Sequence, residues 1–394
     1  MDEASDEVNV SEFHRTIIKY FNQDYSRKAI LALVRKKYNV IISLSTLSRI
    51  QRRYKLRRKN ITESPIEHIL LALSIELGGS GAKLGYKAMW KRLRNVYELK
   101  VKQRTVMELL QLFDPLGVEE RCRCRLKHRQ YDVPGPDYCW HCDNHDKWKR
   151  FGFAIYGIID GFSRKVLSIQ VASTNNKPEV ISYQYVKTIV ELDRIPTILR
   201  TDKGTEAPIM GDMQMALRSF HDDEHAGLNS YKTGRSTSNQ RIESWWRQFR
   251  QRLGQYYMDL FKIMEREGIL NLGNPLHIEG LRYCFGHLLK EEIESTIQEW
   301  NEHRIRKQSN RNVLSGIPNE LYDCPEMVGA TDCRKPLDVD QAQILFLEYA
   351  QIPRLCCPDF KIAVEAAMPD IQTPTTAEEA YDLFLDILDL IEQD

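Results

Sequence analysis

The chain has 394 residues, 42% hydrophobic and 28% charged, which is the composition of a folded globular protein of about two or three domains. This composition excludes a disordered or collagen-like chain, and the sequence has no apolar run of the length that crosses a bilayer. Nine cysteines, an odd number spread along the chain, disfavour a disulfide framework. We therefore expect a nuclear or cytosolic protein with reduced thiols.

The net charge of +1 conceals a segregation of charge along the chain. Residues 331–394 hold 14 acidic and 4 basic residues, a net charge of −10, which leaves +11 on residues 1–330. Residues 15–60 hold 14 Lys and Arg against a single acidic residue, Asp24. Such a concentration is typical of a nucleic-acid-binding surface, because each cation beside a phosphate releases a condensed counterion. A solvated basic face or a nuclear-import signal is the alternative interpretation.

Residues 13–60, behind an acidic tail at residues 1–12, predict two short amphipathic helices joined by a tight turn. The first begins after an expected N-cap at Ser26 and the second after an expected N-cap at Ser43. The polar face of the second helix carries side chains that reach base edges or phosphates: Ser45, Ser48, Arg49, Arg52 and Arg53. This pattern is typical of a helix-turn-helix DNA-binding domain with a basic extension.

A second helical unit is predicted over residues 61–130. Ser64 is expected as the N-cap of a helix that stops at Gly78. Two further amphipathic stretches, at residues 84–96 and 104–112, complete either another helix-turn-helix or a helical spacer that packs on its neighbours. The pattern favours neither alternative.

A change to aromatic and β-branched runs after residues 134–136 marks a domain boundary, so we expect a new domain to begin near Asp137. Three short apolar stretches separated by turn-like segments predict consecutive antiparallel strands at residues 138–143, 151–159 and 166–172. A helix over residues 178–192 and a fourth strand at residues 197–200 follow, and this strand leads into Asp202. That order places Asp202 at the carboxyl edge of the sheet, where α/β proteins bind ligands.

A further helix starts near Asn239. One face of this helix carries the residues at positions i, i+4, i+8 and i+11: Asn239, Glu243, Arg247 and Arg250. This face presents a carboxylate followed by two guanidinium groups, and a DNA strand can lie along it. The loop before the helix offers two more phosphate contacts, Lys232 and Arg235. For each of these residues a solvated rim is the alternative. We expect Trp245 and Trp246 in the core or against a partner protein, not as stacking platforms for bases.

The order of these elements, with Asp at the end of the first strand, Asp after the fourth strand and Glu on a late helix, resembles the ribonuclease-H-like core of retroviral integrases and DDE transposases. The likeness covers about residues 120–325. Five local strings are similar to those of the eukaryotic, transposon-related integrase-core-domain proteins: WHCD at 140–143, IDGFSR at 159–164, RTDKGTE at 200–206, SNQRIE at 238–243 and WNEHR at 300–304.

The resemblance implies an α/β ribonuclease-H-like core at residues 137–270, a mixed sheet with flanking helices, and a helical extension at residues 271–325. It implies a catalytic and metal-binding trio, Asp143, Asp202 and Glu243. Two Mg²⁺ or Mn²⁺ ions on such carboxylates activate water or a 3′-hydroxyl and stabilise the leaving oxygen, so that no protein nucleophile is required. Integrases act as oligomers because two DNA ends are joined together, so a homo-oligomer is expected.

Two features depart from this pattern or compete with it. Zinc is not expected, although Cys139 and Cys142 flank a histidine, because the other close pair, Cys122 and Cys124, has a one-residue gap where structural zinc sites use two to four. Ala207 stands where the family string usually continues with Asn, which weakens a local hydrogen bond.

Residues 326–394 form an acidic tail with one predicted amphipathic helix, at residues 377–391. This helix either binds a partner protein or folds back on the basic N-terminal region and competes with DNA. The sequence does not choose between these roles.

The sequence thus predicts a transposon-derived integrase or transposase that binds DNA, cleaves it with divalent metal ions and transfers strands. The alternative is a domesticated, catalytically silent DNA-binding protein or regulator on the same fold. A nuclease that cuts RNA–DNA hybrids is a third possibility, since it would share the metal site and differ in its substrate.

Overall fold

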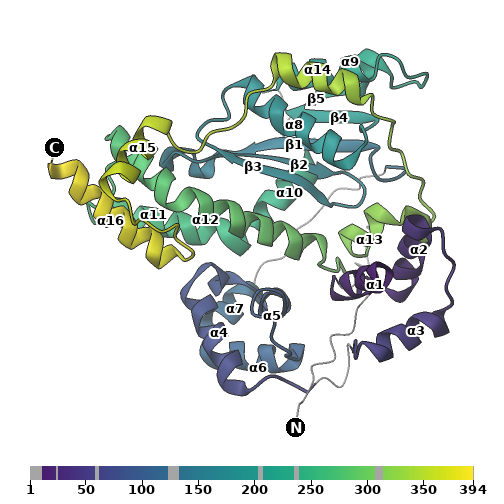
Figure 1. The fold of residues 1–394 in the computed structure, drawn as a ribbon, viewed down its shortest axis with the longest axis horizontal. Helices are drawn as coiled ribbons and strands as arrows, with labels where there is room; N and C mark the ends of the chain where they lie inside the picture. The colour runs from purple at the N-terminus through teal and green to yellow at the C-terminus, as the bar shows by residue number, and fades with distance from the viewer. Residues whose placement is uncertain are drawn as a thin grey trace, which may run out of the picture.

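The computed structural model describes residues 11–23, 25–57, 62–122, 133–202, 207–234, 239–306 and 314–393. In Figure 1 a central sheet lies between two layers of helices, and the N-terminal helices lie together on one side of this core. Among the helices of these residues, none has both the length and the apolar character that a bilayer span requires.

A five-stranded mixed sheet, in the order β3-β2-β1-β4-β5, forms the centre of the core. Strands β1 (Cys139–His145), β2 (Ala154–Asp160) and β3 (Val166–Ala172) form an antiparallel meander. Strands β4 (Ile198–Asp202) and β5 (Tyr231–Gly234) continue the sheet in parallel with β1. The sheet and its flanking helices confirm the predicted α/β, ribonuclease-H-like class; β5 was not predicted. Strand β2 is buried throughout, which explains its almost uninterrupted apolar sequence.

Helices cover both faces of the sheet (Figure 1). On one face the apolar sides of β1 and β2 pack with α8 (Pro178–Leu192), α9 (Pro208–Leu217) and α14 (Val339–Tyr349). The other face is covered by α10 (Gln240–Phe249), a π-helical turn (Arg250–Gly254), α11 (Gln255–Arg266), the long α12 (Pro275–Asn301) and α16 (Ala377–Gln393). Of these helices, α8 has the predicted bounds, whereas α9 and α14 were not predicted.

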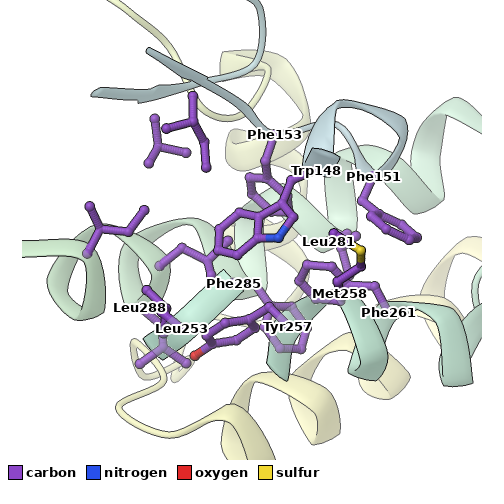
Figure 2. Close-up of a cluster of buried hydrophobic side chains, with 14 of the residues drawn as sticks. Trp148, Phe151, Phe153, Leu253, Tyr257, Met258, Phe261, Leu281, Phe285 and Leu288 are labelled. Atoms are coloured by element: carbon purple, nitrogen blue, oxygen red, sulfur yellow. The ribbon is translucent and has the colours of Figure 1, made fainter. Parts of the chain in front are cut away.

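An aromatic cluster fills the second layer. A 3₁₀ turn, η2 (Asp146–Phe151), follows β1 and carries Trp148 and Phe151 into this cluster, so β2 begins later than predicted. Figure 2 shows how side chains from η2, the residue before β2, α11 and α12 meet there: Trp148, Phe151, Phe153, Tyr257, Met258, Phe261, Leu281 and Phe285. Phe261 packs edge-on against Phe285 with ring centroids 5.1 Å apart. This packing fixes α11 and α12 beneath the sheet.

The N-terminal residues form three short helices around a core of their own: α1 (Glu12–Asn22), α2 (Arg27–Tyr38) and α3 (Leu44–Arg53). Both predicted N-caps are confirmed, because Ser26 Oγ accepts from the Ala29 amide at 3.2 Å and Ser43 Oγ accepts from the Thr46 amide at 3.1 Å. Helix α1 was not predicted.

The second unit contains α4 (Ile66–Gly78), a 3₁₀ turn η1 (Ser80–Lys83), α5 (Tyr86–Asn95), α6 (Gln103–Phe113) and α7 (Pro115–Cys122). Its helices pack around a separate apolar cluster. The prediction that Ser64 caps α4 is wrong: Pro65 holds the N-cap position. Ser64 instead pairs with Lys100, accepting from its amide at 2.9 Å and donating its own amide to the Lys100 carbonyl at 2.7 Å.

Both N-terminal units contact the C-terminal part of the core. The connection between α1 and α2 meets α13 (Pro318–Asp323), where Tyr25 donates its hydroxyl to Asp323 Oδ2 at 2.6 Å and the Ser26 amide donates to Glu320. Lys36 adds an ion pair with Glu326 at 3.4 Å. These contacts involve α2 and the residues just before it, and they leave the cationic face of α3 exposed.

A buried ion-pair network joins the second unit to α12. Arg92 donates to Glu299 and to Glu76, each at 2.9 Å, and the three side chains are only 3–10% exposed. Arg252, beside α11, adds a contact to Glu299 at 3.3 Å. In such a network each charge depends on its partners, because removing one leaves the others desolvated and unpaired.

The acidic C-terminal segment is part of the core. The predicted helix is confirmed as α16. Of the two roles that the sequence left open, folding back on the basic N-terminal region is not what the structure shows, because α16 packs against α12. Its apolar stripe, with Phe384, Ile387 and Leu388, is buried in the cluster beneath the sheet. Asp382 and Asp386 lie on the exposed side. The apolar stripe decides this position, since its burial removes far more surface from water than a surface charge contact does.

We predict that Arg92→Ala destabilises the protein by about 3–5 kcal/mol, because Glu76 and Glu299 would remain buried without their shared cation. Urea unfolding followed by circular dichroism measures this change. The matched control is Arg104→Ala, which removes an exposed i, i+4 pair with Glu108 and leaves the urea midpoint nearly unchanged. Equal midpoints for the two variants would contradict this account of the network.

Candidate active site

Two aspartates lie side by side on neighbouring parallel strands. In the β1–β4 ladder His141 stands opposite Arg200, an offset of 59 residues. The same offset separates Asp143 from Asp202, so the two residues occupy adjacent positions where β4 ends. From the sequence, Asp143 was predicted to be the last residue of the first strand. The strand instead continues to His145, so Asp143 lies inside β1. Asp143 is buried and Asp202 is half-buried.

The third predicted carboxylate, Glu243, comes from a helix that packs against the sheet. It lies in the first turn of α10, which packs against β1 and β2, and its side chain is exposed. Burial, and after it the negative charges of Glu243 and Asp202, together raise the pKa of Asp143 to about 7. The structure therefore places Asp202 and Glu243 near enough to Asp143 for their charges to act on its carboxyl group.

The donor set fits divalent cations chemically. Carboxylate oxygens are the ligands that Mg²⁺ and Mn²⁺ prefer, and a bound cation lowers the free energy of clustered negative charges. Within the described residues, no group of three or more His, Cys, Asp or Glu side chains is close enough to hold one ion together. Asp143 is the carboxylate that interacts with both of the others, because the charges of Glu243 and of Asp202 each raise its pKa.

Two hydrogen bonds fasten the start of α10 to β1. Asn239, the residue before the helix, donates its amide NH₂ to the Cys142 carbonyl at 2.6 Å, and its Oδ1 accepts from His141 Nδ1 at 2.7 Å. Burial lowers the pKa of His141 to about 3, so this imidazole is neutral. The contact holds the helix beside the backbone that leads into Asp143.

The prediction that Asn239 contacts DNA is therefore wrong. Its side chain is 1% exposed and both ends of its amide bond to β1. Helical spacing placed it on the same face as Glu243, but Asn239 precedes the helix, and its φ of −95° and ψ of 36° are not helical. The side chain consequently turns inward.

A further contact between α10 and β1 was not predicted from the sequence. Trp246 donates its indole N–H to Asp143 Oδ2 at 3.1 Å, with both residues buried. Trp246 lies three residues after Glu243, which places the two on adjacent positions of the helix surface. This spacing from Glu243 is the feature of the sequence that could have indicated the contact. Trp246 was correctly predicted to lie in the core, but its hydrogen bond to Asp143 was not predicted.

The structure separates the remaining predicted DNA contacts into two groups. On α3, Ser45, Arg49, Arg52 and Arg53 are exposed and Ser48 is half-buried. Near the carboxylates, Arg247 and Arg250 are exposed, Lys232 is half-buried on β5, and Arg235 lies outside the described residues. In Figure 1, α3 lies at the edge of the molecule, away from the sheet. Contact of either group with DNA stays a prediction.

The cysteines beside the site are involved in packing. Cys142 is completely buried, and burial raises the pKa of its thiol well above the usual value. Cys139 Sγ lies 3.8 Å from His141 Nε2, while the other nitrogen of this ring bonds Asn239. Cys124, a member of the alternative zinc set, lies outside the described residues.

Comparison with models of protein families matches residues 130–324 to the family whose description is integrase core domain. This segment contains the five strands, α8 to α13 and all three carboxylates. A search of curated proteins finds no match to the chain.

We predict that Asn239→Ala lowers the free energy of unfolding by about 2–4 kcal/mol, because the buried His141 N–H and Cys142 carbonyl each lose a partner. Urea unfolding of the purified variant measures the loss. Arg247→Ala, on the exposed side of the same helix, serves as the control and leaves stability nearly unchanged. A small loss for Asn239→Ala, within the error of the control, would show that Asn239 is not an anchor.

Proposed function

The chain belongs, through residues 130–324, to the integrase core family of the retroviral integrase and DDE transposase superfamily, and we propose that it catalyses metal-dependent cleavage and transfer of DNA strands. One structural observation supports this proposal in addition to the family match. Asp143 and Asp202 lie at neighbouring positions of the paired strands β1 and β4, and Glu243 lies in the first turn of α10, which packs against β1.

Integrase core domains generally use divalent metals, and in this chain Asp143, Asp202 and Glu243 would hold them. Two such cations would activate water or a 3′-hydroxyl on one side of a phosphodiester and stabilise the leaving oxygen on the other. The protein's own contribution is to bind and orient: β1 and β4 align two carboxylates, and α10 brings the third. Arg247, one turn beyond Glu243 and exposed, is placed to neutralise a phosphate of the DNA strand.

Residues 13–60 would supply binding to the DNA duplex. Helix α3 exposes three arginines, Arg49, Arg52 and Arg53, on a small helical unit that docks on α13 through Tyr25 and Lys36. Exposed cations on one helix face neutralise phosphates and release counterions, so affinity depends steeply on salt. We propose that this unit acts as a helix-turn-helix, that the protein works in the nucleus, and that two or more copies assemble to join two DNA ends.

The alternative is a domesticated DNA-binding protein on the same fold, without catalysis. It requires only the exposed cations of α3 and no metal at Asp143, Asp202 and Glu243. The same DNA-binding surface and the same core would then act as a scaffold. The two alternatives differ in whether nicking depends on Glu243.

We predict that the purified protein nicks supercoiled plasmid with Mg²⁺ or Mn²⁺ and that Glu243→Gln lowers the rate by at least about 100-fold, since one metal ligand loses its charge. Gel separation of supercoiled and nicked plasmid measures the rate. Glu267→Gln, the same change at the exposed end of α11, is the control and keeps full activity. If wild type and Glu243→Gln are both inert on plasmid and on native ends, the catalytic proposal is wrong.

The binding surface makes a separate prediction. Replacing Arg49, Arg52 and Arg53 together by Ala should reduce the slope of log affinity against log salt concentration by about 3, because each lost phosphate contact removes about 0.9. Fluorescence anisotropy on duplex DNA measures this slope. The control replaces three exposed arginines elsewhere, Arg104, Arg266 and Arg334. Equal slopes for the two triple variants would exclude α3 as the DNA-binding helix.

A further inference from the structure

We infer that Trp246 is a positioning residue for the metal-binding carboxylate of Asp143, an inference that rests on the proposed function. The indole N–H donates to Oδ2 of Asp143 at 3.1 Å. Trp246 is 5% exposed and Asp143 is 8% exposed, so water does not replace this bond readily. The bond joins α10, the helix that carries Glu243, to β1, the strand that carries Asp143.

Packing fixes the direction of this N–H group. The indole stacks on His145 with ring centroids 4.9 Å apart and an interplanar angle of 30°, and it meets Phe249 edge-on at 5.9 Å. Its far edge lies over Gly157, the residue opposite Asp143 in the β1–β2 ladder. A Cβ atom at Gly157 would lie 2.7 Å from Cη2 of the ring, so glycine is required for this close approach. The ring is thus held from three sides while its N–H faces the carboxylate.

The chemistry of the donor suits a metal ligand. An indole N–H is a neutral donor, so it orients a carboxylate without competing with a metal ion for the negative charge. A Lys or Arg side chain would compete, because it is positively charged. Metal-binding carboxylates are commonly held by such neighbouring donors, and removing the donor typically weakens metal binding by 10–100-fold. Because Glu243 lies three residues earlier on the same helix, one rigid element delivers a ligand and positions a second.

The neighbouring tryptophan provides a matched control. Trp245 is 1% exposed and packs against Trp300 with ring centroids 5.2 Å apart. Its indole nitrogen has no hydrogen-bond partner among the described residues. Trp245→Phe and Trp246→Phe therefore make the same chemical change in the same buried helix, and only the second removes a bond to Asp143. A role in packing alone predicts similar effects for both.

The test measures Mn²⁺ binding to the full chain by electron paramagnetic resonance of the free ion, for wild type, Trp246→Phe and Trp245→Phe. We expect the dissociation constant to rise about 10-fold or more in Trp246→Phe and to stay within about twofold in Trp245→Phe. Thermal unfolding of each variant shows that the fold is retained. In ¹⁵N spectra, the indole signal that Trp246→Phe removes should shift when Mg²⁺ is added to wild type.

The outcomes separate this inference from the proposed function. Equal Mn²⁺ affinity in the two variants, or a Trp246 indole signal that Mg²⁺ leaves in place, would overturn the positioning role alone. A wild-type protein that neither binds Mn²⁺ nor nicks plasmid would overturn the proposed function and this inference with it. A selective loss of affinity in Trp246→Phe, with an indole signal that responds to Mg²⁺, supports the inference.

Discussion

The crowding of three carboxylates around β1 is the constraint on which the rest of the structure depends. Asp143 is buried in the field of Asp202 and Glu243, which makes its charged form costly and the arrangement self-repelling. A fold keeps such a cluster only if the backbone imposes it. Here the parallel pairing of β1 with β4 aligns the aspartates, and bonds from Asn239 and Trp246 hold α10 against β1. The repulsion that remains is what a bound divalent cation would offset.

The layers around the site make this geometry rigid. Helix α12 packs beneath the sheet through the aromatic cluster and also carries Glu299, the centre of the buried network with Arg92 and Arg252. The same helix therefore supports the core and fixes the second N-terminal unit. The first unit docks on α13 through Tyr25 and Lys36, which leaves α3 exposed. The DNA-binding candidate and the carboxylates thus belong to one packed structure.

Local patterns predicted much of this fold, and contacts between distant residues explain what they missed. The caps of α2 and α3, the bounds of β3 and α8, and the mixed sheet follow from spacing, turn residues and the family resemblance. Strand β5, only four residues long, exists because β4 offers it an edge. Asn239 was assigned to the wrong surface because helical periodicity does not apply to a residue before the helix. The bond from Trp246 to Asp143 spans 103 residues, so only the fold brings the two together.

The central claim is that these carboxylates form a two-metal site, and the most direct measurement is anomalous diffraction from crystals grown with Mn²⁺ and a DNA duplex. We expect two anomalous peaks about 3.5–4 Å apart, from ions bound by Asp143, Asp202 and Glu243. Peaks that lie elsewhere, or the absence of any peak at the end of β4 while DNA occupies the site, would contradict it.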